Sequence, residues 1–296
     1  ICVTASHNPK QYTGMKVVRR GALPVGGDSG LEDVRAGAQA GFGPVTKRGE
    51  ITPLDVWPGF VDKVLSFVDV TAIAPLRIVV DAANGMAGAM LPPVLERLPQ
   101  VEVVRCCFDP DGTFPNHEPN PLLEENRAFI VAKTREEGAA LGVAYDGDAD
   151  RCFFVDDTGE FVPNDFVTAL LAEVMLGKSP GGTVLYDVRA SWAVPRTIAA
   201  AGGTALVNRV GHAFIKHRMR KENAVFAGEV SAHYYFRDFT QADTGVVPFL
   251  LMLELISKRG AKLSEILQPF RDQYFLTGEI NTPVADVPLK LQEIKE

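Results

Sequence analysis

The sequence predicts an α/β fold built of consecutive domains with mixed, mostly parallel sheets. Short apolar runs rich in β-branched residues alternate with longer segments of helical spacing. This order of strand, loop and helix occurs in two consecutive stretches that share one plan, and in each stretch the third strand ends at the most polar loop. Because ligands of parallel sheets bind beyond the carboxyl ends of strands, we expect the functional groups at those two loops.

The first stretch opens with the buried apolar run 77–81, and a polar loop at 82–85 follows it. Turn residues then separate each further element from the next. The expected elements are a helix through 98, a strand at 101–107, a helix at about 124–137, a strand at 141–145 and a hairpin of 151–156 with 160–163.

The second stretch repeats this order after about residue 180 with little sequence identity to the first. Its strands are short and apolar, and its helices have polar outer faces. The expected elements are strands at 183–187, 204–207 and 224–227, a helix through 201 and a helix at about 214–221.

Composition excludes several classes of function. The 296 residues are 46% hydrophobic and carry a net charge of −7 without a Lys/Arg block. This argues against nucleic acid or a membrane as partner, and no apolar run approaches the ~20 residues of a membrane span. Four cysteines, Cys2, Cys106, Cys107 and Cys152, fit no metal spacing. They are typical of reduced thiols in a cytoplasmic protein.

Pro- and Gly-containing segments near 57–59, 161–163 and 268–274 suggest boundaries, which give four parts: 1–56, 57–160, 161–272 and 273–296. The first part looks too short and glycine-rich to bury its own core. The chain opens in what looks like a strand and closes in a charged helical segment. We therefore expect a piece of a longer protein, truncated at both ends.

The most informative motif places Asp146, Asp148 and Asp150 at alternate positions after an apolar strand, with Arg151 next. An EF-hand loop fails to match, because glycine is expected where Arg151 stands and glutamate where Asp157 stands. A solvated turn does not need three carboxylates, which repel one another unless a cation lies between them. All-oxygen ligation with room for a phosphate oxygen favours Mg²⁺.

A second motif, Thr4–Pro9, sets the hydroxyl of Ser6 beside the imidazole of His7 in a loop that Asn8–Pro9 stiffens. A hydrolase nucleophile is disfavoured, because no Gly-x-Ser-x-Gly elbow is present. Lys16 follows Thr13–Gly14. It could be an ordinary strand lysine, a phosphate clamp or, with a lowered pKa, a proton acceptor.

A third group follows the third strand of the second stretch. Glu229, Ser231 and His233 alternate, and in an extended segment they would share one face and could bind vicinal sugar hydroxyls. The alternative interpretation is that these three side chains only form the exposed face of a strand. Arg209 and His212 would add positive charge for a phosphate.

Together these motifs resemble the α-D-phosphohexomutase family, and within it the phosphomannomutase/phosphoglucomutase branch. Thr4–Pro9 resembles the family's active-site serine loop and Asp146–Arg151 its metal loop. Gly228–His233 resembles its sugar-binding loop, with Ala232 where glycine is commoner. Asp111–Pro121 resembles a further family segment, to which we assign no chemical role.

The resemblance implies a four-domain isomerase that interconverts hexose 6-phosphate and hexose 1-phosphate through a phosphoserine and a hexose 1,6-bisphosphate. The four parts would be the end of domain I, domains II and III, and the start of domain IV. Without the remaining domains, the chain alone is expected to be inactive.

The implied roles fall into three sets. Mg²⁺ would be bound by Ser6, Asp146, Asp148 and Asp150. Ser6 would carry the phosphate, with proton transfer assisted by His7 and Lys16 and charge stabilised by Arg151. Substrate would be bound by Glu229, Ser231, His233, Arg209 and His212.

Three alternatives remain open: a phosphoglucosamine mutase, a phosphatase or hydrolase, and a non-catalytic module that binds a divalent metal. The sequence does not distinguish mannose from glucose phosphate, and it gives no oligomeric state.

Overall fold

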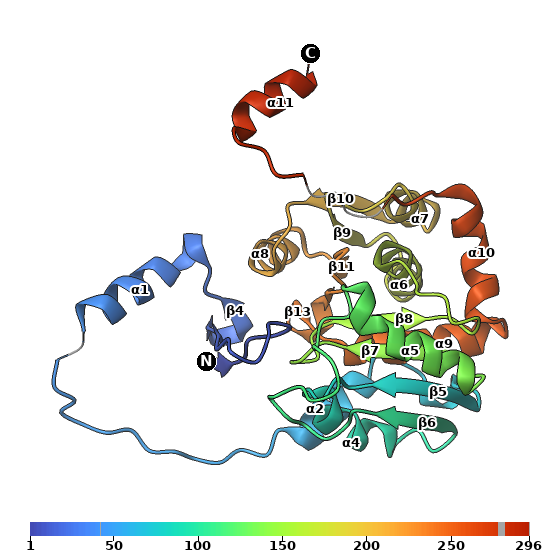
Figure 1. The fold of residues 1–296 in the computed structure, drawn as a ribbon, viewed down its shortest axis with the longest axis horizontal. Helices are drawn as coiled ribbons and strands as arrows, with labels where there is room; N and C mark the ends of the chain where they lie inside the picture. The colour runs from blue at the N-terminus through green and yellow to red at the C-terminus, as the bar shows by residue number, and fades with distance from the viewer. Residues whose placement is uncertain (42, 278–281, 296) are drawn as a thin grey trace.

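The computed structural model describes residues 1–41, 43–277 and 282–295. Its first large sheet has the strand order β6-β5-β7-β8 (Figure 1). The central strand β5 (Leu76–Asp81) pairs in parallel with β6 (Val101–Cys106) on one side and β7 (Leu141–Tyr145) on the other. The last strand, β8 (Cys152–Val155), returns antiparallel to β7.

The second sheet repeats this plan in the order β10-β9-β11-β12-β13. Its strands β9 (Thr183–Asp187), β10 (Thr204–Asn208) and β11 (Phe226–Gly228) are parallel. The strands β12 (Tyr234–Phe236) and β13 (Ala242–Asp243) follow antiparallel. In both sheets the first strand lies between the second and the third, and the third strand turns back into an antiparallel strand. The repeated plan and the α/β fold class are confirmed.

The helices differ from the predicted ones at one place. A single helix through residue 98 was expected, but the chain forms α3 (Ala87–Met90) and then α4 (Pro92–Leu95). Pro92 and Pro93 lack backbone donors, so the chain starts a new helix there instead of continuing the first. The other helices after residue 56 are α2 (Trp57–Leu65), α5 (Glu124–Glu136), α6 (Asn164–Lys178), α7 (Ala193–Ala200), α8 (His212–Glu222), α9 (Val246–Arg259), α10 (Leu263–Gln273) and α11 (Val287–Lys295).

The core is centred on α6 and α9. Every residue of α9 from Val246 to Ile256 is buried, and α9 packs against α2, α6 and β8. A helix that is apolar all round belongs in the interior. Its one buried acid, Glu254, pairs with Lys178 and Lys258, so the charge is compensated. In Figure 1, α6 lies between the two large sheets, where it packs against β11 of the second sheet and against α9, which contacts β8 of the first.

Residues 1–56 form little regular structure. They contain the short strands β1 (Cys2–Val3), β2 (Met15–Lys16), β3 (Val18–Arg19) and β4 (Leu23–Pro24) and the helix α1 (Leu31–Ala40), none of whose residues is buried. Figure 1 shows α1 standing away from the rest of the chain. This agrees with the expectation that the segment cannot bury a core of its own.

At the other end, α11 is exposed along its whole length. The part predicted to begin a further domain, 273–296, includes 278–281 and 296, which lie outside the described residues. In the described ranges, none of the helices is both long and apolar enough to cross a membrane.

The strand that leads to the carboxylate loop depends on a glycine. A Cβ on Gly142 of β7 would lie 2.1 Å from Thr134 Oγ1 and 3.0 Å from Val155 Cβ. We predict that Gly142→Ala lowers the free energy of unfolding by about 1–3 kcal/mol, because it overpacks a buried contact. Urea denaturation measures this.

Gly112→Ala is the matched control, because a Cβ there meets nothing within 4 Å. Thr134→Ala, added to Gly142→Ala, should restore part of the loss. Equal stabilities of Gly142→Ala and Gly112→Ala would show that the contact is not strained.

Candidate active site

The carboxylate loop connects β7 to β8 and lies at the carboxyl end of the sheet. Its carboxylates belong to Asp146, Asp148 and Asp150, which each place an oxygen within 4.8 Å of the others. Asp146 is fully buried, and its Oδ1 accepts a hydrogen bond from Arg151 N–H at 3.2 Å, which closes the loop. The three side chains therefore converge.

The serine loop packs directly on this carboxylate loop, although it is far away in sequence. Ser6 Oγ donates to Asp146 Oδ2 at 3.0 Å and lies 3.2 Å from His7 Nδ1. Thr4 Oγ1 donates to Asp148 Oδ2 at 2.8 Å and accepts from Ser6 N–H at 2.9 Å. Thr4 lies in the predicted serine loop, but the sequence prediction assigned it no role of its own. Its only signal was a second hydroxyl two residues before Ser6.

Lys16 reaches the same carboxylates because β1 and β2 pair antiparallel, with Cys2 opposite Lys16. Its Nζ donates to Asp148 Oδ2 at 2.7 Å and to Asp150 Oδ2 at 2.5 Å. Burial lowers the pKa of Lys16, but attraction to Asp150 and Asp148 outweighs it and raises the pKa above its usual value. The lowered pKa that a proton acceptor needs is therefore absent, and Lys16 is a cation in this arrangement.

The carboxylate loop fits a hard divalent cation. Asp148 Oδ1 is buried and has no hydrogen-bond partner among the described residues, and Asp150 Oδ1 has no hydrogen bond there but lies 3.4 Å from His233 Nε2. Such atoms are costly unless something else binds them. Burial, Asp150 and Asp148 together raise the pKa of Asp146 to about 7, so the cluster resists holding three negative charges without added positive charge. The donors are all oxygens, which suits Mg²⁺.

Arg151 links the carboxylate loop to His7. Arg151 Nη2 donates to His7 Nδ1 at 2.7 Å, and Arg151 Nε lies 3.4 Å from Asp146 Oδ2. Since arginine only donates, His7 Nδ1 is an acceptor and carries no proton. Burial and the charge of Arg151 lower the pKa of His7 to about 4. His7 is thus neutral near pH 7, and its Nδ1, which faces Ser6, accepts the hydrogen bond from Arg151.

The third group lies in a tight turn between β11 and β12, so the prediction of an extended segment was wrong. Glu229 N–H donates to His233 O and Ala232 N–H to Glu229 O, both at 3.0 Å, and Ala232 has φ 68. The chain must reverse here to form the antiparallel pair. The side chains still converge, because Ser231 Oγ lies 2.9 Å and Glu229 Oε2 3.4 Å from His233 Nδ1.

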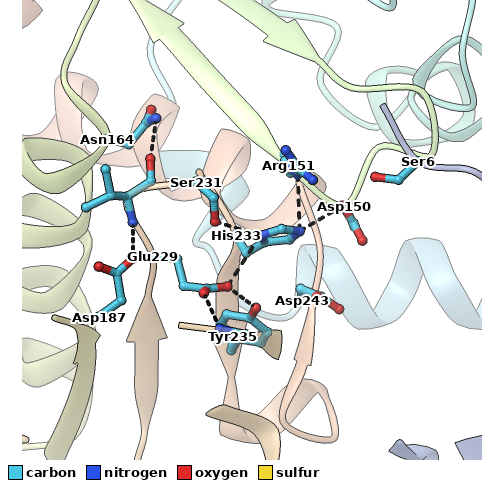
Figure 2. Close-up of polar contacts among 12 residues, drawn as sticks. Ser6, Asp150, Arg151, Asn164, Asp187, Glu229, Ser231, His233, Tyr235 and Asp243 are labelled. Atoms are coloured by element: carbon cyan, nitrogen blue, oxygen red, sulfur yellow. Dashed lines mark hydrogen bonds and ion pairs between the residues drawn. The ribbon is translucent and has the colours of Figure 1, made fainter. Parts of the chain in front are cut away.

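His233 joins this turn to the carboxylate loop (Figure 2). Its Nε2 lies 3.4 Å from Asp150 Oδ1 and 3.2 Å from Arg151 Nε. Burial and Arg151 act against protonation, but Asp150 and Glu229 prevail and raise the pKa of His233 to about 9. The two loops, one from each sheet, are therefore in direct electrostatic contact.

Buried groups of the second sheet hold the turn in place. Val230 N–H donates to Asp187 Oδ2 and Asn164 Nδ2 donates to Val230 O, both at 2.8 Å (Figure 2). Tyr235 OH donates to Glu229 Oε2. Although burial opposes ionisation, hydrogen bonds from His233, Tyr235 and the backbone lower the pKa of Glu229 to about 2. Glu229 is an ionised acceptor fixed in position.

Arg209 and His212 are less closely tied to the site. Gly211 N–H, between them, donates to Glu229 Oε1 at 3.1 Å. Arg209 is exposed and stacks on Phe214 at 3.8 Å, and His212 begins α8. In the part of the chain that the structure describes, neither side chain hydrogen-bonds to another predicted site residue.

Comparison with known proteins identifies the family. Residues 58–159 match the model of the phosphoglucomutase/phosphomannomutase α/β/α domain II, and residues 163–274 match that of domain III. A phosphomannomutase of Salmonella montevideo is 43% identical over 291 residues, 96% of this chain. A protein named phosphohexose mutases of Xanthomonas campestris is 43% identical over 290 residues, 97% of this chain.

The chain belongs to the phosphoglucomutase/phosphomannomutase family. A phosphoglucomutase/phosphomannomutase family protein of Burkholderia thailandensis aligns with it at a TM-score of 0.79 and 34% identity, over 95% of this chain and 59% of the other. The chain spans 64% of the length of these Salmonella and Xanthomonas relatives.

In this family member the charge of Arg151 acts on His7. We predict that Arg151→Gln raises the pKa of His7 from about 4 toward 6.5 but not up to it, because burial is the larger cause. NMR titration of the His7 ring in Mg²⁺-free protein measures this. Arg196→Gln, on α7 outside the site, is the control. An unchanged His7 pKa in Arg151→Gln would contradict the assigned contact.

Proposed function

We propose that this chain carries the chemical centre of a hexose phosphate mutase that interconverts hexose 6-phosphate and hexose 1-phosphate. The observation that carries the proposal is the contact of Ser6 Oγ with Asp146 Oδ2, which are 3.0 Å apart. Two further carboxylates lie close to Asp146, and the cations Lys16 and Arg151 lie beside them. A hydroxyl nucleophile at a cation site with fixed positive charges is what phosphoryl transfer requires. The names of the relatives, phosphomannomutase and phosphohexose mutases, are the reason for proposing a hexose phosphate as substrate.

Phosphorylated Ser6 would donate its phosphoryl group to a sugar hydroxyl. The bond from Ser6 Oγ to phosphorus breaks, a bond from the sugar oxygen to phosphorus forms, and the hydroxyl proton leaves. His7 is neutral and lies beside Ser6, so its Nδ1 would take that proton once Arg151 turns from it toward the phosphoryl group. The product is a hexose 1,6-bisphosphate, which turns over and returns its other phosphate to Ser6.

The charged groups around Ser6 would stabilise the transferring phosphoryl group. Mg²⁺, held by Asp146, Asp148, Asp150 and the oxygen of Ser6, would neutralise charge on the phosphoryl oxygens. Arg151 lies close enough to Asp146 to contribute a fixed positive charge at the same place.

The turn from Glu229 to His233 would bind the sugar. Glu229 is ionised and can accept hydrogen bonds from hydroxyls, and Ser231 lies next to it in the same turn. Glucose and mannose share most of their hydroxyls, so one turn could hold both sugars in either orientation. Relatives named phosphomannomutase favour this sugar class over a 2-amino sugar.

The phosphoserine predicts a covalent product. After incubation with hexose 1,6-bisphosphate, which requires a single transfer to Ser6 and no turnover, intact-mass analysis should find one added phosphate on the parent chain and none on Ser6→Ala, because the carrier oxygen is gone. Ser66→Ala, which changes an exposed serine at the end of α2, should be phosphorylated like the parent. Equal labelling of Ser6→Ala would reject Ser6 as the carrier.

The cation site predicts a binding change. Asp148→Asn should weaken Mg²⁺ binding by about ten- to a hundredfold, because one carboxylate ligand loses its charge while the side chain keeps its shape. Isothermal titration calorimetry of the two proteins measures this. Asp62→Asn, which changes an exposed aspartate of α2, is the control. Mg²⁺ affinity equal to that of the parent would remove Asp148 from the ligand set.

A further inference from the structure

The segment Asp111–Pro121, which the sequence left without a role, covers the loop that follows β5. Asp111 N–H donates to Asn84 O at 2.8 Å, and Asn116 Nδ2 donates to Asn84 Oδ1 at 2.7 Å. Asn84 Nδ2 in turn donates to Asp109 O at 2.9 Å. Asn84 is therefore held by hydrogen bonds from both its backbone and its side chain to this part of the chain.

The loop around Asn84 supports the middle of the carboxylate loop. Met86 N–H donates to Gly147 O at 2.9 Å, and a Cβ on Gly85 would lie 2.6 Å from the same oxygen. Gly147 stands between two of the proposed Mg²⁺ ligands. A small shift of Gly147 would therefore move both carboxylates.

Gly147 is also enclosed from two other sides. A Cβ on Gly147 would lie 2.3 Å from Ser6 O, 3.4 Å from Pro119 and 3.5 Å from Phe114. Phe114 and Pro119 belong to the covering segment. Gly147 is thus fixed between the serine loop, the Asn84 loop and the segment, and only glycine fits this position.

One charged pair anchors the segment. His117 Nε2 lies 2.9 Å from Asp81 Oδ2, and His117 Nδ1 lies 3.0 Å from Glu118 O. Both partners are acceptors, so both ring nitrogens must carry a proton and the ring is a cation. The hydrogen bond to Asp81 raises the pKa of His117 against the effect of burial.

Asp81 ends β5 and is 1% exposed, so its charge needs this partner. Its other oxygen accepts a hydrogen bond from Ala83 N–H at 2.9 Å. Ala83 and Asn84 have φ 49 and φ 54, a left-handed conformation that residues with a side chain adopt only when it is held. Asp81 therefore fixes both the strained turn at Ala83 and Asn84, next to Gly147, and the segment 111–121 that covers Gly147.

We propose that Asp81 and His117 are positioning residues for the proposed Mg²⁺ site: their ion pair clamps the segment 111–121 onto Gly147 and so sets the spacing of Asp146 and Asp148. This inference rests on the proposed function, since it assigns a task toward the cation. Neither residue touches the cation or the substrate. The effect passes from His117 through Pro119 to Gly147.

The test measures Mg²⁺ affinity of the whole chain by isothermal titration calorimetry. His117→Ala should weaken Mg²⁺ binding by about three- to tenfold. This effect is smaller than that of removing a side chain that hydrogen-bonds a metal ligand directly, because His117 acts through Pro119 and Gly147. His117→Gln, which keeps a donor toward Asp81 without the charge, should lie between the parent and His117→Ala. If His117→Ala does not fold, His117→Gln provides the test of the ion pair. His217→Ala, an exposed histidine of α8, is the matched control and should bind as the parent does.

A double-mutant cycle shows whether the pair acts as one unit. Asp81→Asn should weaken Mg²⁺ binding to a similar extent, and combining it with His117→Ala should add little further loss. Folded His117→Ala and His117→Gln with the affinity of the parent would overturn this inference alone. Absence of Mg²⁺ binding by the parent chain itself would overturn the proposed function and this inference with it.

Discussion

Mutual repulsion of the three carboxylates after β7 is the constraint on which the rest of this site depends. Asp146 is fully buried, and burial with its two neighbours raises its pKa to about 7. Positive charge therefore has to be supplied by neighbouring side chains. Lys16 comes from the short strand pair at the start of the chain, and Arg151 comes from the loop itself. Without them, the carboxylate loop would carry uncompensated negative charge where it packs against the serine loop.

The repeated sheet plan explains how two remote loops meet. In each sheet the third parallel strand turns back into an antiparallel strand, so a polar turn lies at the carboxyl edge of each. The helix α6 packs between the sheets, and His233 spans the two turns between Asp150 and Glu229. Family membership and the fold agree with this arrangement.

Backbone strain is concentrated at the same edge. Ser6, Ala83, Ala149 and Ala232 all have left-handed φ values, and each lies in a loop that borders the site or supports it. Such conformations cost free energy, and they persist because surrounding hydrogen bonds determine them. The site is thus prearranged by the fold, which suits a reaction in which charge stabilisation depends on fixed groups.

The sequence alone determined the α/β class, the repeated plan and the convergence of Asp146, Asp148 and Asp150, because strand periodicity and alternate spacing are local properties. It could not determine that Glu229–His233 is a turn, since a short alternating segment fits either conformation. It also missed Thr4 and the pair of His117 with Asp81. Those contacts join residues far apart in the chain, and the raised pKa of Lys16 likewise comes from distant residues, Asp150 and Asp148. Only the tertiary structure decides them, because electrostatic partners are set by distance in space and not by spacing in sequence.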